Sequence, residues 1–229
     1  MNTPTIKPFG ERGFIAQLGG FSSDVDSGLF ANAVARALRD KNGVDDAVAG
    51  IDTIAMRFDP AQLDAEQAHA MLLDAASNTP RNTRSVAAKV IDIPVCYGGE
   101  YGPDFDALCT QLKLTPEALV KLHSGAPYRV ITIGFAPGFA YLGELPEGLS
   151  VPRLETPRLH VAAGSVGVAG RYTGVYSLPS PGGWRIIGRT PRALFDGREH
   201  HPFIFEPGDE VRFRAVTPSA FAAITRAQP

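Results

Sequence analysis

The chain has 229 residues, of which 44% are hydrophobic and 20% are charged, and its formal net charge at pH 7 is −2. These proportions exclude a disordered chain, and the near-zero charge argues against general binding to nucleic acid or to an anionic membrane surface. Because no apolar run approaches the ~20 residues of a membrane span, and the first residues lack a secretion signal, we expect a cytoplasmic protein.

The first 90 residues predict strands that alternate with helices, on the evidence of capping residues and apolar spacing. The predicted elements are strands over 14–18, 44–50, 52–58 and 86–95, one helix from Ser23 or Asp24 to Asn42–Gly43, and another from Asp59–Pro60 to about Ser77. This β-α-β-β-α-β order is that of the ferredoxin-like fold. We therefore predict an α+β protein whose residues 1–90 form a small ferredoxin-like domain.

Glycine and proline are concentrated in the remainder of the chain. Residues 91–229 contain 17 Gly and 15 Pro, or about 23% of the segment, against a usual share of roughly 12%. Many turns between short strands produce such a density. The predicted elements are helices over 103–112 and from Thr115, then strands over 128–135, 165–169, 174–178, 184–188 and 210–214. We predict a closed or nearly closed β-barrel over residues 91–229.

Three glycine-containing segments are candidates for a binding site. In 133–143, glycines let the backbone approach a ligand, although a barrel corner filled by aromatic rings would look the same. The segment 163–167 resembles the hydrolase elbow GxSxG but has Ala in place of the first Gly, which leaves backbone N–H groups as possible oxyanion donors. The segment 180–184 predicts a tight turn, and its single Trp184 either packs on the barrel or forms a pocket wall.

Positive charge gathers in residues 125–192, where seven Arg and three Glu give +4. Arginine suits two-pronged binding of carboxylate or phosphate, although surface ion pairs would account for many of the seven. No histidine pattern indicates a metal site, and no CxxC indicates a zinc site or a disulfide framework. His123 comes near the end of a predicted helix, where the helix dipole favours a cation, so we expect a structural role for it.

Four motifs, in order along the chain, together resemble one family, that of the 5-oxoprolinase B subunit, also labelled allophanate hydrolase subunit 1 or the sporulation-kinase inhibitor family. They are Ile93–Gly99, Ile133–Gly143, Ala163–Gly170 and Ser180–Pro191, and the resemblance runs from about Phe9 to Val216. Two positions depart from the family pattern. Tyr172 replaces a usual Gln before Thr173, and Ala162 replaces a usual Pro.

The resemblance implies a cyclophilin-like C-terminal barrel and a hydrolase that works with a homologous C subunit, together with a separate A subunit. The three would convert 5-oxo-L-proline, a cyclic amide, to L-glutamate with ATP hydrolysis. ATP would be a co-substrate, bound here or on a partner, with Mg²⁺ accompanying it and no protein-bound metal. The alternatives are a regulatory protein that inhibits a sensor histidine kinase and a component of urea or allophanate metabolism.

The candidate site residues follow from these motifs and from the chemistry of activating an amide, which needs cations around a phosphoryl group and donors for developing charge. As catalytic residues we assign Arg158 and Arg189, which would clamp the anion. As substrate-binding residues we assign Phe135, Gly138, Tyr141, Gly164, Ser165, Thr173, Tyr176, Ser180, Gly182 and Gly183.

Overall fold

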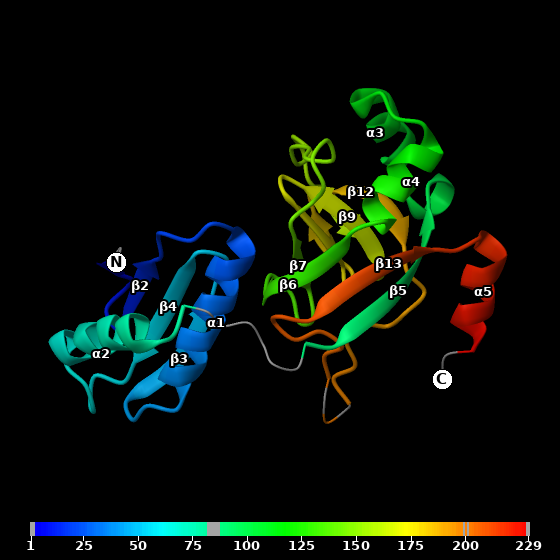
Figure 1. The fold of residues 1–229 in the computed structure, drawn as a ribbon. Helices are drawn as coiled ribbons and strands as arrows, with labels where there is room; N and C mark the ends of the chain where they lie inside the picture. The colour runs from blue at the N-terminus through cyan, green and yellow to red at the C-terminus, as the bar shows by residue number, and fades with distance from the viewer. Residues whose placement is uncertain (1–2, 82–87, 199, 201, 228–229) are drawn as a thin grey trace. The chain divides into compact units, whose positions relative to one another are not determined.

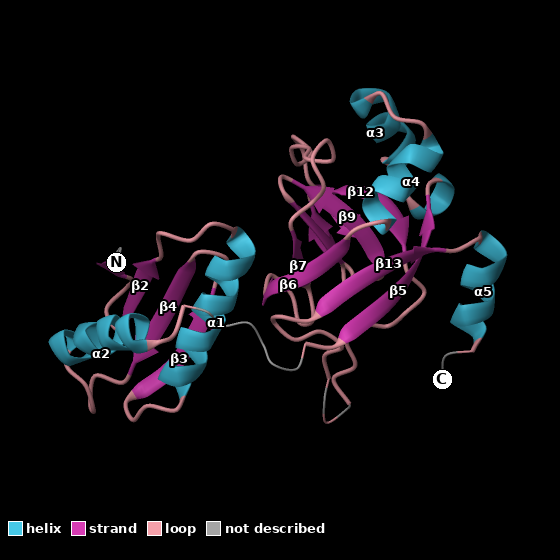
Figure 2. Ribbon diagram, viewed as in Figure 1, coloured by secondary structure: helices cyan, strands magenta, loops and turns pink. Residues whose placement is uncertain are grey.

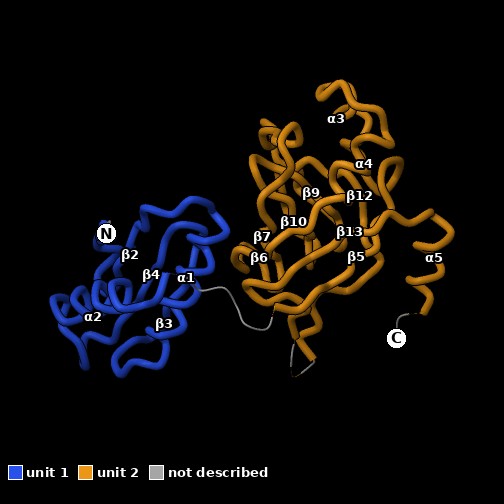
Figure 3. The backbone as a smooth tube through the Cα atoms, viewed as in Figure 1, with its two compact units in different colours: residues 1–86 blue, residues 87–229 orange. Residues whose placement is uncertain are grey.

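Two compact units, residues 1–86 and 87–229, make up the chain in the computed structural model (Figure 3). The structure describes residues 3–81, 88–198, 200 and 202–227. Each unit has its own core of buried apolar side chains. Within the described residues, no helix combines the length and the apolar character that crossing a membrane requires.

The first unit is a four-stranded antiparallel sheet with two helices on one face (Figures 1 and 2). Its elements are β1 (Thr5–Pro8), β2 (Gly13–Gln17), α1 (Asp24–Arg39), β3 (Val44–Ala49), β4 (Thr53–Phe58) and α2 (Ala65–Asn78), and the strand order is β1-β2-β4-β3. Phe30 of α1 and Leu72 of α2 pack against Phe14 and Ile54 of the sheet. Caps define both helix starts: Ser23 accepts from the Asp26 amide, and Asp64 forms a capping box with Gln67.

The predicted ferredoxin-like order is wrong for the first unit. The structure adds β1, which was not predicted, and the strand predicted over 86–95 is β5 (Val90–Tyr97), which belongs to the second unit. Residues 86 and 87 of that prediction lie outside the described residues. The reason is pairing: β5 runs parallel to β13 (Glu210–Ala215) and antiparallel to β12 (Arg185–Arg189).

The second unit confirms the prediction of a closed β-barrel, with strand order β10-β7-β6-β13-β5-β12-β9. The remaining barrel strands are β6 (Pro127–Ile133), β7 (Ala140–Gly143), β9 (Ser165–Ala169) and β10 (Tyr172–Val175). Outside the barrel lie a short 3₁₀ helix η1 (Gly99–Tyr101), α3 (Phe105–Leu112), α4 (Pro116–Ser124), α5 (Pro218–Arg226) and the pair β8 (Arg158–Val161) and β11 (Ser180–Gly182).

Side chains alternate between two apolar clusters along the barrel strands, as the period of two in a strand requires. Val168 and Val175 belong to the large barrel core, whereas Ala169 and Tyr176 belong to a smaller cluster with Phe139 and Trp184. Gly174 makes room for the second cluster, because a Cβ there would lie 3.0 Å from the Phe139 ring and 3.3 Å from that of Trp184. The smaller cluster therefore packs on the outer face of the barrel.

Candidate functional site

Aromatic rings surround a cavity of about 80 Å³ on this outer face. The cavity is lined by Phe135, Phe139, Tyr141, Arg153, Tyr176, Gly182, Gly183 and Trp184. The rings meet edge to face: Phe139 stands at 90° to Trp184 with centroids 5.5 Å apart, and at 73° to Tyr141 with centroids 5.0 Å apart. We call this the aromatic cavity. Such packing fixes each ring and gives a rigid apolar wall.

Backbone conformation positions two residues that line the aromatic cavity, Phe135 and Gly182. Phe135 has φ of 70°, which is rare for a residue with a side chain, and its ring is 63% exposed at the cavity. Gly182 faces Tyr176 so closely that a Cβ at this position would collide with the tyrosine hydroxyl. The narrow approach of β11 to Tyr176 thus depends on glycine.

The polar groups of the aromatic cavity are two phenols and one guanidinium. Burial raises the pKa of Tyr141 and of Tyr176, and the cation of Arg153 acts weakly in the opposite sense on both. Both phenols therefore stay protonated and can donate a hydrogen bond at neutral pH. Among the described residues, Arg153 has no ion-pair partner. The cavity thus offers flat apolar surface, two hydroxyl donors and one positive charge.

The structure brings five of the assigned substrate-binding residues together in the aromatic cavity: Phe135, Tyr141, Tyr176, Gly182 and Gly183. Trp184 both packs on the barrel and forms a wall, so its two expected roles coexist. Phe139 and Arg153 also line the cavity and are not among the residues predicted from the sequence. Phe139 lies in the Ile133–Gly143 motif, which was a usable signal, whereas Arg153 stood out only as one of seven arginines in a basic segment.

Arg189 and Gly164 line a second, larger cavity of about 400 Å³. Gly164 adopts φ of 81°, and a Cβ there would collide with the Thr190 carbonyl. Its amide donates to the Tyr176 carbonyl at 2.7 Å, and the Ser165 amide donates to the Ala162 carbonyl at 3.2 Å. Neither amide is therefore available to an oxyanion in this conformation.

Gly138 and Ser180 lie near the two cavities without lining either of them. Gly138 has φ of 76°, and a Cβ there would lie 3.4 Å from Ser177 Cβ, in the wall of the larger cavity. Ser180 begins β11, and its buried hydroxyl has no hydrogen-bond partner among the described residues. These two assignments stay predictions.

Arg158 forms a two-pronged ion pair with Asp104, a carboxylate that is 7% exposed. Two of its five N–H donors are thereby used, and the facing carboxylate offsets its positive charge. The residue lies on β8, beside the aromatic cavity but not among its lining residues. The structure thus gives Arg158 a structural partner, and its assignment as an anion clamp stays a prediction.

Thr173 points into the barrel, where it ends a buried chain of hydrogen bonds. The Thr173 hydroxyl donates to the Gly167 carbonyl at 3.0 Å, so its oxygen accepts from Nε2 of His123 at 2.9 Å. Nδ1 of His123 then accepts from the Tyr97 hydroxyl at 2.8 Å. This chain satisfies one neutral tautomer of the histidine, with its proton on Nε2.

The prediction that His123 serves as a cation at a helix end is wrong. Its ring is fully buried, and burial lowers its pKa to about 3, so it is neutral at physiological pH. The helix α4 directs the ring inward, where it packs against Phe213 and Tyr128 with centroids 4.6 and 5.5 Å apart. Its role is structural, but it is that of a neutral ring.

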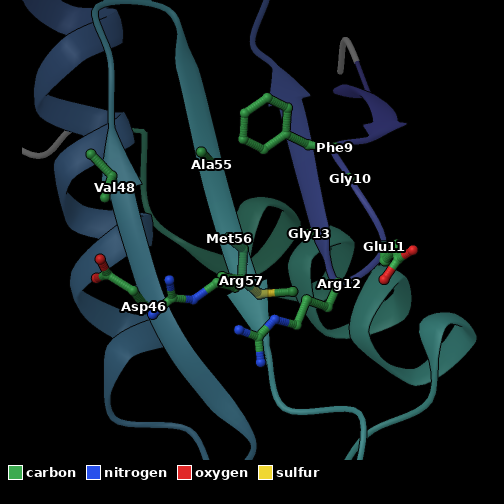
Figure 4. Close-up of a pocket in the computed structure, with 10 residues that line it drawn as sticks. All are labelled: Phe9, Gly10, Glu11, Arg12, Gly13, Asp46, Val48, Ala55, Met56 and Arg57. Carbon is green, nitrogen blue, oxygen red and sulfur yellow. The ribbon is translucent and has the colours of Figure 1, made fainter.

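A third cavity, of about 250 Å³, lies on the sheet of the first unit (Figure 4). Phe9, Val48 and Ala55 supply its apolar surface, while Arg12 and Arg57 both pair with Asp45 nearby. In the view of Figure 4 the helices lie behind the strands, so this is the face they leave uncovered. None of the assigned site residues lines it.

The described part of the chain contains neither a cluster of metal-ligating side chains nor a disulfide. No group of three or more His, Cys, Asp or Glu side chains gathers there to hold a metal ion. Cys96 and Cys109 are both buried and unpaired, and burial raises the pKa of each thiol. Both cysteines pack as small apolar side chains.

Comparison with known proteins gives curated relatives for part of the chain. It is 43% identical over 138 residues to the 5-oxoprolinase B subunit of Bacillus subtilis (strain 168), covering 60% of this chain and 58% of that protein. It is 50% identical over 126 residues to the 5-oxoprolinase B subunit of Escherichia coli O157:H7, covering 55% and 58%. The matched stretch thus spans a little over half the length of these relatives.

Solved structures extend the likeness to nearly the whole chain. A conserved uncharacterized protein from Pyrococcus horikoshii is 36% identical, with a TM-score of 0.56, over 95% of this chain and all of that one. The urea amidolyase of K. lactis shares the fold at a TM-score of 0.80 but only 18% identity, over 97% of this chain and 15% of that one.

The family itself is shown by a match over residues 4–205 to the family described as the carboxyltransferase domain, subdomain C and D. Together with the relatives that are 5-oxoprolinase B subunits, this match confirms the family that the four motifs indicated. The chain belongs to the carboxyltransferase subdomain C and D family.

Proposed function

We propose that this protein is the B subunit of an ATP-dependent 5-oxoprolinase, a hydrolase that acts only in complex with its partner C and A subunits. The observation that carries the proposal is the aromatic cavity with Arg153, which has no ion-pair partner among the described residues. Identity of 43–50% to curated 5-oxoprolinase B subunits supports it. Because the reaction consumes ATP, we place it in the cytoplasm.

The lining of the cavity suits the substrate in its apolar surface and in its charge. 5-Oxo-L-proline is a small, nearly planar five-membered lactam with one carboxylate. Its ring would lie against the wall that Phe139, Tyr141 and Trp184 form. Its carboxylate would pair with Arg153, because an arginine can bind a carboxylate through two parallel hydrogen bonds. The protonated phenol of Tyr141 or Tyr176 would donate to the lactam oxygen.

The chemistry to be assisted is the opening of an unreactive amide. Transfer of the γ-phosphoryl group of ATP to the lactam oxygen releases ADP and makes the ring carbon electrophilic. Water then adds to that carbon and the C–N bond breaks, which leaves an acyl phosphate on the opened chain. A second water hydrolyses this acyl phosphate and gives L-glutamate and phosphate. Preorganised donors at the lactam oxygen stabilise the charge that develops during transfer.

The test is to co-express the chain with candidate A and C subunits and to measure release of ADP and glutamate that depends on 5-oxoproline, omitting each subunit in turn. We expect turnover only with all three. Arg153→Ala should raise KM for 5-oxoproline by about tenfold, equal to roughly 1.4 kcal/mol of binding. A matched control is Arg212→Ala, which removes the same charge from β13, away from the cavity. A stable complex without turnover would contradict the proposal and direct the search to another amide.

A further inference from the structure

The larger cavity, of about 400 Å³, lies between the segment that follows β12 and the helix α5. Its size falls within the range of small-molecule binding sites, about 300–1,000 Å³. We call it the arginine cavity. The cavity is lined by two arginines, Arg189 and Arg192, by three hydroxyl residues, and by apolar surface from Leu194, Pro191 and Phe221.

Both arginines of this cavity are free to bind an anion. Neither has an acidic partner among the described residues, and no residue that lines the cavity is acidic. Each is held in place by one bond to a backbone carbonyl: Arg189 Nε donates to Ala163 at 3.0 Å, and Arg192 Nη1 donates to Asp92 at 3.0 Å. Each guanidinium therefore keeps four of its five N–H donors for a ligand.

Two of the three hydroxyl groups contribute little to recognition, because their protons are already used. The Ser177 hydroxyl donates to the Pro137 carbonyl, and the Thr225 hydroxyl donates to the Phe221 carbonyl. Thr190 Oγ1 accepts from the Arg192 amide. The charged donors to a ligand thus come from two guanidinium groups, which favours a ligand with several anionic oxygens over a neutral sugar or amide.

An aromatic wall adds a place for a flat ring. Phe221 of α5 lines the cavity and packs against Tyr101 of η1 with ring centroids 4.6 Å apart. Burial raises the pKa of Tyr101, and the positive charge of Arg189 lowers it by a smaller amount. Flat apolar surface and two guanidinium groups therefore lie at one site.

We propose that the arginine cavity binds a nucleoside triphosphate, with its phosphate groups on Arg189 and Arg192 and its base against Phe221. The identity of the nucleotide as ATP rests on the function proposed above. Consecutive residues line the two cavities, since Tyr176 lines the aromatic cavity and Ser177 lines the arginine cavity.

The test measures binding by titration calorimetry, using the full chain alone and in its complex with the C subunit. The probes are ATP, inorganic tripolyphosphate, adenosine and citrate. We expect Arg192→Ala to weaken ATP and tripolyphosphate at least tenfold, and Phe221→Leu to weaken ATP but not tripolyphosphate. Arg212→Ala, which removes an equal charge outside the cavity, should change neither. Thermal unfolding of each variant checks that the fold is retained, and Arg192→Lys should restore part of the affinity.

Each outcome separates this inference from the proposed function. Suppose that 5-oxoproline is turned over but ATP binds neither to the chain alone nor to its complex with the C subunit: the inference is then overturned and the proposed function stands. The same holds if turnover occurs and Arg192→Ala changes neither the affinity for ATP nor the KM for ATP. If ATP binds through Arg192 but no 5-oxoproline is consumed, the function fails and the inference stands. Citrate binding as tightly as tripolyphosphate would overturn the assignment of a phosphate ligand.

Discussion

Arg158 and Asp104 form a two-pronged ion pair, with Nη1 2.9 Å from Oδ2 and Nη2 2.6 Å from Oδ1. The same Oδ2 accepts the amide proton of Ile186 at 2.6 Å. Arg158 lies on β8, Asp104 precedes α3, and Ile186 lies on β12. The buried Asp104 carboxylate therefore connects β8 and the start of α3 to the barrel strand β12.

Arg158→Ala should destabilise the fold, because it leaves the Asp104 carboxylate buried with a single donor. A buried group that loses its partner costs about 1–3 kcal/mol, and the 31% exposure of the Arg158 side chain places the loss toward the lower end. Urea unfolding measures it, with Arg198→Ala as the control, since that arginine is 89% exposed and its ion pair is on the surface. Unchanged stability together with a lower kcat would instead favour Arg158 as the anion clamp.

His123 should make the stability of the fold depend on pH. Its folded pKa of about 3 lies below the usual value of 6.5, so the unfolded chain binds the proton more tightly. The stabilising contribution is full above pH 6.5 and is lost as the pH falls, by about 1.4 kcal/mol per pH unit. Urea unfolding at pH 7 and pH 5 should show a loss of about 2 kcal/mol from this group.

The matched variant for that measurement is His123→Gln, which can hydrogen bond to Tyr97 and Thr173 but does not titrate. It should be less stable at pH 7 and show a flatter dependence on pH. Equal slopes for the two proteins would mean that His123 is not held neutral. Nitrogen chemical shifts of the imidazole give an independent check, since the hydrogen-bond chain requires the proton on Nε2.

Thr173→Val should lower stability without changing the affinity for substrate. The substitution removes the hydroxyl that accepts from His123 and donates to the Gly167 carbonyl, and leaves both partners unpaired inside the barrel. The expected cost is about 1–3 kcal/mol, measured by urea unfolding. An unchanged unfolding midpoint with a raised KM for 5-oxoproline would restore Thr173 to the substrate-binding residues.

Gly182→Ala and Gly183→Ala form a matched pair that tests the aromatic cavity. A Cβ at Gly182 would collide with the Tyr176 hydroxyl, whereas a Cβ at Gly183 would meet Pro157 Cγ at an ordinary 3.6 Å. Because Tyr176 is only 2% exposed, it cannot move away freely, and overpacking costs about 1–3 kcal/mol. Only Gly182→Ala should raise KM for 5-oxoproline; equal values for both variants would place the substrate elsewhere.

The sequence pattern predicted the positions of strands and helices better than it predicted the pairing of the strands. The apolar run that became β5 was correctly identified as a strand, but its partner β13 lies about 120 residues further along, with Val90 opposite Glu210. No local pattern carries that information. β1 was missed because its four residues are all exposed or half-buried and end in Pro8, so they show no alternation. α5 was also missed, although Thr217 and Pro218 supply a cap and a favourable first residue.

The glycines and aromatic residues of the site could be predicted from sequence motifs, whereas the arginine that supplies its charge could not. Phe135 and Tyr141 come from the motif Ile133–Gly143 and Gly182 from the motif Ser180–Pro191, and all three line the aromatic cavity. Arg153 follows Val151 and Pro152 without any recognisable pattern, so only the structure distinguishes it from Arg158, whose charge is matched by Asp104. Which arginine is free depends on contacts between distant segments.

The pairing of β5 with β13 has a consequence for how the chain matures on the ribosome. All four strands of the first sheet lie within residues 5–58, so that sheet can assemble while translation continues. The barrel cannot close until Glu210–Ala215 has emerged, because that strand fills the place between β5 and β6. During that interval the nascent second unit exposes the open edges of β5 and β6, and this is when the chain most needs protection from aggregation.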